Sequence, residues 1–260
     1  MSMEGFIAII PARLSSTRLP AKVLADIGGV PMVVRVARQA AASGAKQVMV
    51  AADDSLIVST CTNYGVDAVL TSKSHATGTD RLAETINLLA LENDAIVVNV
   101  QADEPLLPPA LIKTVADVLA NRPNCAIATC AHPIHARAEI FNPNIVKVVC
   151  DAQQRALLFS RAPIPWGREC FASPNNDLPG DAPPILRHIG LYAYRASFLR
   201  EFPKLSNCLL EQFEALEQLR ALWHGFEIAV QIIDSTPPGG VDTPEDLLRV
   251  RKILQQQSEL

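Results

Sequence analysis

The chain has 260 residues, of which 49% are hydrophobic, so it can bury a sizeable core and fits one α/β unit with an added lobe. Its formal net charge of -4 at pH 7 excludes the basic excess that is typical of nucleic-acid-binding domains. No apolar run reaches the roughly 18 residues of a membrane span, and no basic region with a cleavable apolar segment opens the chain. We therefore expect a soluble, cytoplasmic protein that binds neither nucleic acid nor a membrane.

The first half of the chain alternates short apolar runs with helical patterns, which predicts β-α-β units and a mostly parallel sheet. The expected strands comprise residues 6–11, 47–52, 68–70 and 95–100. The expected helices comprise residues 31–43, 79–91 and 109–120. The first helix opens with a proline and stops before Gly44, as helices commonly do.

The second half has a different texture. A polar stretch over residues 168–184, rich in Pro, Asn and Asp, predicts an exposed, mobile excursion. The expected strands comprise residues 125–130, 145–150, 185–194 and 227–233. The expected helices comprise residues 209–223, closed by Gly225, and a final helix from Pro244.

The loop after the first strand carries three cations, Arg13, Arg18 and Lys22, together with several hydroxyl groups. The chain contains neither G-x-x-x-x-G-K-[ST] nor G-x-G-x-x-G, so no standard phosphate loop is present. Guanidinium forks and an ammonium can replace such a loop. Because ligands bind after the strands of an α/β sheet, these cations predict a triphosphate site, with a solvated basic turn as the alternative.

Two acidic residues are candidate metal ligands. Asp103 follows the fourth predicted strand, where it can offer a hard oxygen to Mg²⁺, or can be an ordinary strand-end turn residue. Near the C-terminus, Thr243 is the predicted N-cap of the last helix, with Pro244 at its first position and Asp246 three residues after the cap. Asp242 is then free to approach the same cation from another loop, or is a second capping candidate.

Six collinear segments carry a resemblance to a known family. They are IPAR with STRLP and Lys22, TGTDRLAE from Thr77, NVQ with DEP from Asn99, FSR with IPW from Phe159, RHIG from Arg187, and VDTPEDL from Val241. Together they cover nearly the whole chain, and the chain resembles the 3-deoxy-manno-octulosonate (Kdo) cytidylyltransferases.

This resemblance implies a Rossmann-like nucleotidyltransferase with a mostly parallel mixed sheet flanked by helices. It implies a single domain over residues 1–260, in which a smaller lobe at about residues 155–225 contributes the sugar site and dimer contacts. The implied reaction transfers CMP from CTP to Kdo and releases pyrophosphate for lipopolysaccharide biosynthesis. Mg²⁺ is the implied cofactor, and a homodimer is the implied assembly.

The resemblance also assigns roles, motif by motif. The implied catalytic residues are Arg13, Lys22, Asp103 and Asp242, of which Asp103 and Asp242 would hold the metal. The implied nucleotide-binding residues are Pro11, Ala12, Arg13, Ser16, Arg18, Lys22, Thr77, Gly78, Thr79, Arg81 and Gln101. The implied sugar-binding residues are Gln101, Arg161, His188, Tyr192, Glu217 and Gln218.

The chemistry of the sugar residues suits an anionic, hydroxyl-rich acid, because an Arg fork can bind its carboxylate and the other side chains its hydroxyls. Pattern alone assigns Glu217 and Gln218 to an ordinary wet helical face, opposite Phe213 and other apolar residues. His188 and Tyr192 lie four apart on a predicted strand, so they face the same side, which suits one pocket or simple packing.

The chain departs from the family pattern, which has glycine where Ala21 and Ala102 stand. The methyl group of Ala102 could crowd a substrate if that glycine permits a close backbone approach or a positive φ.

No residue is singled out as a general base. The alternatives are a cytidylyltransferase for sialic acid or 8-amino-Kdo, and a catalytically silent nucleotide-binding regulatory module, although the retained cations and carboxylates speak against a silent module.

Overall fold

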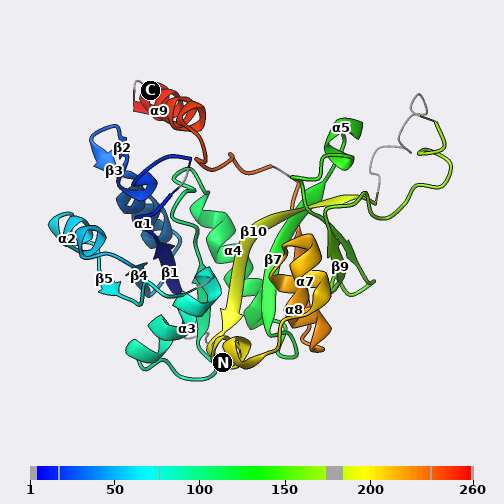
Figure 1. The fold of residues 1–260 in the computed structure, drawn as a ribbon, viewed down its shortest axis with the longest axis horizontal. Coiled ribbons are helices and arrows are strands. Elements are labelled where there is room, and N and C mark those ends of the chain that lie inside the picture. Colours follow the sequence, from blue (N-terminus) through cyan, green and yellow to red (C-terminus); the bar gives the residue numbers. More distant parts are fainter. Residues whose placement is uncertain (1–4, 17, 76, 174–183, 235, 259–260) are drawn as a thin grey trace.

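The structure is a computed structural model that describes residues 5–16, 18–75, 77–173, 184–234 and 236–258. These residues form a nine-stranded sheet flanked by helices (Figure 1), together with a small two-stranded ribbon. Along the sheet the strands follow the order β11, β7, β10, β6, β1, β4, β5, and the strands β8 and β9 extend it beside β10. The predicted α/β class with a mostly parallel mixed sheet is therefore confirmed.

The sheet is parallel apart from β10 and the β8–β9 extension. Its strands are β1 (Ile7–Ala12), β4 (Gln47–Ala52), β5 (Ala68–Leu70), β6 (Ile96–Asn99), β7 (Ile127–Pro133), β8 (Lys147–Cys150), β9 (Ala156–Ser160), β10 (Leu186–Arg195) and β11 (Ile228–Ile232). β10 is antiparallel to both of its long neighbours, β6 and β7. Because β1 is parallel to both β4 and β6, the carboxyl ends of these three strands meet at one edge of the sheet.

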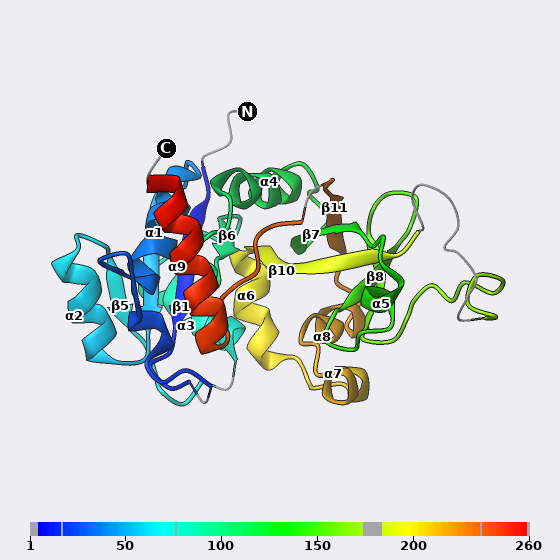
Figure 2. The same ribbon diagram turned by 90° about the horizontal axis from the view of Figure 1, so that it is seen from above.

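The helices pack on both faces of this sheet (Figure 2). They are α1 (Met32–Ala42), α2 (Ser55–Asn63), α3 (Gly78–Leu88), α4 (Pro109–Ala120), α5 (Arg137–Ile140), α6 (Ala196–Glu201), α7 (Leu209–Glu214), α8 (Gln218–Trp223) and α9 (Pro244–Ser258), with short 3₁₀ helices at Lys22–Leu24 and Phe202–Lys204. The ribbon consists of β2 (Asp26–Ile27) and β3 (Val30–Pro31).

Alternation along β1 divides the core between the two faces, because successive strand side chains point to opposite sides. Ala8 and Ile10 pack in one cluster with side chains of α1 and α4, such as Val36. Ile7 and Ile9 pack in another with side chains of α3, α6 and α8. Burying both faces explains why β1 is apolar along its whole length.

The final helix lies away from its neighbours in sequence. After β11 the chain returns across the molecule to the side of α1 (Figure 1), and α9 packs on the ribbon and on Leu106 through Leu247 and Val250. The helix begins at Pro244 as predicted. The Thr243 hydroxyl accepts from the backbone N–H of Asp246 at 3.2 Å, and the Asp246 carboxylate accepts from the N–H of Thr243 at 3.1 Å, which confirms the predicted cap.

One predicted helix is wrong. Residues 209–223 form two short helices, α7 and α8, because Ala215 adopts a left-handed conformation with φ 51° and ends α7. The sequence has no glycine at this break to signal it. The strands β8, β10 and β11 and the helices α1, α3 and α4 match their predictions to within a few residues. The elements α2, α5, α6, β2, β3 and β9 were not predicted.

Two further expectations meet the structure only in part. Within the predicted polar excursion, residues 174–183 lie outside the described residues, and Phe171 is buried against Ile140 and Ile185 rather than exposed. The predicted lobe at about residues 155–225 contains β10, which lies inside the main sheet, while β9, α7 and α8 lie together on the side of β7 (Figure 1). The single-domain division itself stays a prediction.

None of the helices within the described ranges has the length and apolar character needed to cross a membrane.

Candidate active site

Two adjoining cavities lie along the sheet, one beyond the carboxyl ends of β1 and β6 and the other against the face that carries Tyr192 and Tyr194 of β10. The first has a volume of about 250 Å³ and is lined by Pro11, Arg13, Ser15, Ser16, Lys22, Val23, Gly78, Gln101, Ala102 and Asp103. The second has a volume of about 220 Å³ and is lined by Gly78, Thr79, Asn99, Gln101, Ile127, Tyr192, Tyr194, Phe198, Phe202, Glu217 and Gln218. Because Gly78 and Gln101 line both, the two cavities share a wall, and Gln101 stands between them as the resemblance implies.

The cationic loop and the two candidate metal ligands meet at Lys22. Its Nζ donates to Asp103 Oδ2 at 2.7 Å and to Asp242 Oδ1 at 3.1 Å. Arg18 Nη2 also lies 3.1 Å from the Asp242 carboxylate. The structure therefore brings together a predicted phosphate-binding loop near the N-terminus and two carboxylates, one after β6 and one just before α9.

The backbone explains why Asp242 reaches this point. The N–H of Val241 donates to the carbonyl of Asp103 at 2.8 Å, which ties the segment before α9 to the loop after β6. A Cβ atom on Gly240 would lie 3.0 Å from that same carbonyl oxygen, a tight contact, so this close approach favours glycine. Asp246 accepts from the Asp242 N–H at 3.1 Å and leaves the Asp242 side chain free to face Lys22.

Electrostatics at this junction favours a charged Lys22. Burial opposes the ammonium, but the hydrogen bonds and charges of Asp103 and then Asp242 outweigh it and raise the pKa of Lys22. In the neighbouring Glu104 a raised pKa favours the neutral form of the carboxyl group. Burial, helped by the charge of Asp103, raises the pKa of Glu104 to about 7.

The two carboxylates fit a magnesium ion. Within the described ranges no group of three or more His, Cys, Asp or Glu side chains could hold a metal, so no closed protein cage is present there. Mg²⁺ is commonly bound by one or two carboxylates together with substrate phosphates and water. Asp103 and Asp242 would supply the protein part of such a site, and the first cavity borders Asp103.

One wall of the first cavity is formed by Gly78, the first residue of α3. Arg13 Nη2 donates to the carbonyl of His75 at 3.1 Å, which fixes the predicted phosphate ligand against this wall. Thr77 caps α3, and its hydroxyl and backbone N–H are both bonded to Asp80. Arg81 is completely buried and donates to Thr71 and Ser72, so in this structure it supports the wall and does not line either cavity.

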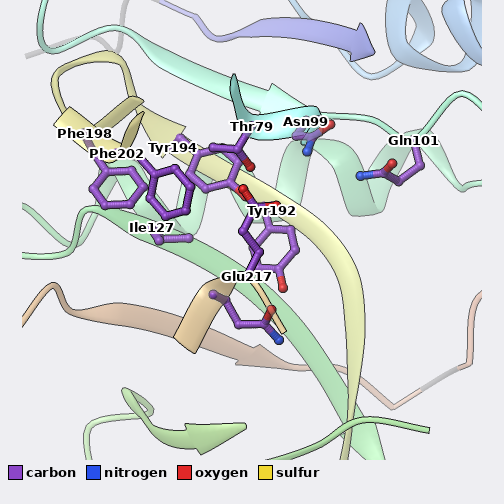
Figure 3. Close-up of a pocket in the computed structure, with 11 residues that line it drawn as sticks. Thr79, Asn99, Gln101, Ile127, Tyr192, Tyr194, Phe198, Phe202 and Glu217 are labelled. Carbon is purple, nitrogen blue, oxygen red and sulfur yellow. The ribbon is translucent and has the colours of Figure 1, made fainter. Parts of the chain in front are cut away.

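The second cavity combines an aromatic side with unpaired polar atoms (Figure 3). The ring centroids of Tyr192 and Tyr194 are 5.7 Å apart in a stacked arrangement, and the row continues to Phe198 at 6.0 Å. Two buried acceptors, Asn99 Oδ1 and Glu217 Oε1, have no hydrogen-bond partner among the described residues. Such a cavity is matched to a ligand that offers hydrogen-bond donors, because an unpaired buried acceptor costs free energy.

Glu217 and Gln218 correct the prediction of a wet helical face. Both line the second cavity, and burial raises the pKa of Glu217. Of the apolar residues placed opposite them, Leu209 is 80% and Phe213 92% exposed, whereas Leu216 is buried as predicted. The reason is the break at Ala215, across which one helical periodicity does not continue.

His188 and Tyr192 face the same side of β10, as predicted, with ring centroids 5.3 Å apart. Burial lowers the pKa of His188 to about 3, so its imidazole is neutral. Of these two rings, only that of Tyr192 lines the second cavity directly. Asn99, Phe198 and Phe202 also line it, although the sequence analysis did not select them. For Asn99 the available signal was its place at the carboxyl end of β6, next to Gln101.

A comparison with models of protein families shows to which family the chain belongs. The model of a family described as cytidylyltransferase matches residues 7–230. The chain belongs to the cytidylyltransferase family. It is 58% identical over 256 residues to the 3-deoxy-manno-octulosonate cytidylyltransferase of Methylibium petroleiphilum, a match that covers 98% of this chain and 97% of the relative.

Solved structures agree with this assignment. A CMP:2-keto-3-deoxy-manno-octonic acid synthetase complexed with CTP superposes with a TM-score of 0.87 at 36% identity, over 98% of this chain and all of the other. A nucleotidyl transferase from Methanothermobacter superposes with a TM-score of 0.58 at 14% identity over 98% of this chain, and this likeness concerns the fold alone. The predicted Rossmann-like nucleotidyltransferase fold is thereby confirmed, and so is the assignment of the chain as an enzyme of this class.

Ala21 and Ala102, the two positions at which the resemblance implies glycine, differ in their backbone. Ala21 adopts φ 51° and ψ 33°, the left-handed region that favours glycine, directly before Lys22. Ala102 is buried, lines the first cavity, and is not among the described residues with positive φ. Its methyl group is therefore accommodated without left-handed strain.

Arg161 is the one predicted sugar residue whose charged group is bound to the protein's own backbone. Its guanidinium donates to the carbonyls of Glu214 at 2.7 Å and Pro143 at 3.0 Å, and it does not line either cavity. Glu214 in turn accepts from the Arg161 N–H at 2.9 Å, and the buried ammonium of Lys147 donates to the Arg161 carbonyl. The role of Arg161 toward the sugar stays a prediction.

Proposed function

We propose that this cytidylyltransferase transfers CMP from CTP to the anomeric hydroxyl of Kdo and releases pyrophosphate. The observation that carries the proposal is the pair of cavities that share Gly78 and Gln101. One cavity has cations and a carboxylate suited to a triphosphate with its metal. The other has unpaired acceptors and phenols suited to a hydroxyl-rich acceptor.

In the proposed reaction the Kdo hydroxyl oxygen forms a bond to the α-phosphorus, and the bond from that phosphorus to the pyrophosphate oxygen breaks. The hydroxyl proton leaves to solvent, since no side chain is assigned as a base. Arg13, Arg18 and Lys22 stabilise the charge on the phosphates as pyrophosphate departs. Asp103 and Asp242 would hold Mg²⁺, which when bound neutralises phosphate charge. Positioning of the two substrates against Gln101 supplies much of the remaining rate enhancement.

Kdo as the acceptor is supported by the chemistry of the second cavity and by the names of the relatives. Asn99 Oδ1 and Glu217 Oε1 can accept from sugar hydroxyls, which would satisfy two buried oxygen atoms, although the Glu217 carboxyl as a whole also interacts with Thr77 and Thr79. Both the Methylibium relative and the solved synthetase carry names that refer to this sugar acid. We further propose that the product feeds lipopolysaccharide biosynthesis and that the enzyme acts in the cytoplasm.

The competing acceptors are sialic acid and 8-amino-Kdo, and the competing function is a silent nucleotide-binding module. The experiment is to incubate the enzyme with CTP and Mg²⁺ and each acid separately, and to identify the nucleotide sugar by mass spectrometry. CMP-Kdo as the main product supports the proposal. A preference for either other acid, or no nucleotide sugar with any acid, contradicts it.

We also propose that the enzyme is a homodimer that pairs through an apolar surface formed by α7 and β9. This α7–β9 surface contains Leu157, Leu158, Leu209, Leu210 and Phe213, all exposed. Exposed apolar side chains gathered on adjoining elements are typical of an interface. A second copy of the chain is the expected occupant, because the resemblance implies a homodimer.

Sedimentation of the Phe213→Glu variant tests this assembly. We expect the wild type to sediment as a dimer and the variant as a monomer, because a buried unpaired carboxylate is costly at an interface. The matched control is Leu56→Glu on α2, which is exposed at the other end of the sheet and should leave the dimer intact. A monomeric wild type, or a dimeric Phe213→Glu variant, would contradict the assignment.

A further inference from the structure

A single buried hydroxyl lies behind the ring of His188. Thr129 is completely buried on β7, and its Oγ1 lies 3.0 Å from His188 Nε2. The same oxygen lies 3.0 Å from the carbonyl of Ile189 and 2.8 Å from the carbonyl of Leu191. One hydroxyl group thus has three polar neighbours, all on β10.

Counting protons fixes the direction of these hydrogen bonds. A threonine hydroxyl has one proton and two lone pairs, and a carbonyl oxygen can only accept. The hydroxyl must therefore give its proton to the carbonyls, and it can bond to His188 only by accepting from an Nε2–H. If Nε2 were unprotonated, the hydroxyl would have to turn to it and leave both buried carbonyls without this donor, which costs free energy.

The other ring nitrogen then follows. Because the imidazole is neutral, a proton on Nε2 leaves Nδ1 with a lone pair. No hydrogen bond from a described residue to Nδ1 is present among the contacts of His188, whose other ring contacts are to Phe159 at 4.9 Å and Tyr192 at 5.3 Å between centroids. Tyr192 lines the second cavity, so the His188 ring lies next to the proposed acceptor site.

We propose that Thr129 is a positioning residue that holds His188 as the Nε2–H tautomer and so presents Nδ1 as a hydrogen-bond acceptor for a hydroxyl of the acceptor sugar. This inference rests on the proposed function, because it assigns the sugar to the second cavity. It adds a residue of β7 that touches no substrate and acts on the sugar through His188.

The strand geometry gives the same hydroxyl a second task, which the experiment has to separate from the first. The register between β10 and β7 shifts between Ile189 and Tyr192, and the Thr129 hydroxyl bonds to two carbonyls within this irregular segment. Loss of the hydroxyl therefore affects the backbone of β10 as well as the ring. A purely structural role would change stability without changing which ring nitrogen is protonated.

The experiment compares Thr129→Val, which keeps the shape and removes the hydroxyl, with Thr129→Ser, which keeps the hydroxyl. In ¹⁵N-labelled protein the couplings between ring nitrogens and carbon-bound protons report the tautomer, and a His188→Gln sample identifies the signals of this ring. We expect the Nε2–H tautomer in the wild type and in Thr129→Ser, and a loss of this preference in Thr129→Val. Kinetically, Thr129→Val should raise the KM for Kdo about 3- to 10-fold and leave the KM for CTP unchanged.

An Nδ1–H tautomer in the wild type, or the same tautomer with and without the hydroxyl, would overturn the proposal. So would equal rises of both KM values in Thr129→Val with no recovery in Thr129→Ser. The tautomer measurement needs no substrate, so it stays informative if the wild type makes no CMP-Kdo. Failure of the wild type to make CMP-Kdo would count against the proposed function and not against the role of Thr129 in setting the tautomer.

Discussion

Asp103 and Asp242 accept hydrogen bonds from one and the same ammonium group, that of Lys22, at 2.7 and 3.1 Å. One of them follows β6 and the other precedes α9, and the backbone bond from Val241 to Asp103 keeps the two segments together. Two carboxylates this close to one cation can also share a divalent ion. This pairing links the cationic loop after β1 to the chemistry that we propose for the site.

Replacing either carboxylate tests that link. We expect Asp103→Asn and Asp242→Asn each to lower kcat by more than about 100-fold, because an amide binds Mg²⁺ more weakly and the transferring phosphate loses its charge partner. Initial rates over a range of Mg²⁺ concentrations are the measurement, with circular dichroism to show an intact fold. The control is Asp94→Asn, an exposed residue just before β6, which should keep wild-type rates. Turnover within a few-fold of wild type for Asp103→Asn would speak against a metal at this carboxylate.

Glu217 is expected to cost stability at neutral pH. Its folded-state pKa is raised by burial above the unfolded value of about 4.3, so the folded state binds a proton more tightly than the unfolded state. The free energy of unfolding therefore falls as pH rises from the unfolded pKa through the folded one. Glu217→Gln mimics the neutral form, so it should stabilise the protein at pH 8 and have little effect near pH 4. Urea unfolding at both pH values measures this, with exposed Glu92→Gln as the control.

The opposite pattern, with Glu217→Gln less stable at pH 8 than at pH 4 relative to wild type, would mean that the carboxylate is well paired when charged. We also expect this variant to lose affinity for Kdo. Such a trade of stability for binding is common where an active site keeps an unsatisfied polar group.

Arg161→Ala should raise the KM for Kdo about 10- to 100-fold and affect the KM for CTP much less. The guanidinium lies on the backbone of Glu214 and Pro143, so the expected loss comes from the missing charge and from a looser segment around residue 161. Steady-state kinetics with each substrate varied in turn provide the measurement. Arg155→Ala, which removes an ion pair with Asp151 on the same hairpin, is the control. Equal rises in both KM values would argue against a sugar-specific role.

Ala21→Gly should stabilise the enzyme by about 1 kcal/mol, since a left-handed conformation strains any residue with a Cβ. The same chemical change at Ala41, exposed on helix α1, should instead destabilise by about 1 kcal/mol. Urea unfolding of both variants gives the comparison. Destabilisation by Ala21→Gly would show that the turn before Lys22 carries no such strain.

Much of the fold was predictable because its signals are local. The apolar runs of β1 and β4 and the apolar faces of α1 and α4 show directly in the sequence, and the Thr243 cap marks the start of α9. The break at Ala215 was not predictable, because an alanine in the left-handed region leaves no mark in the sequence. The helical periodicity was carried across that break, and Glu217 was placed on the wrong face.

The residues of the site were largely predictable, but their meeting in space was not. Pattern identified the cations and carboxylates, and the resemblance gave their partners. The meeting of Asp103 with Asp242 depends on a backbone bond and on the missing Cβ of Gly240, and sequence spacing contains neither. The contribution of Asn99 depends on which atoms remain unpaired, a property of the folded cavity alone.

The most direct test of the account is pyrophosphate release from CTP in the presence of Mg²⁺ and Kdo, with ATP, GTP and UTP in parallel and with EDTA added to a further sample. We expect rapid release with CTP that requires Kdo and is abolished by EDTA, and far slower release with the other nucleotides. Release that is independent of Kdo, unaffected by EDTA, or as fast with the purine nucleotides would contradict it.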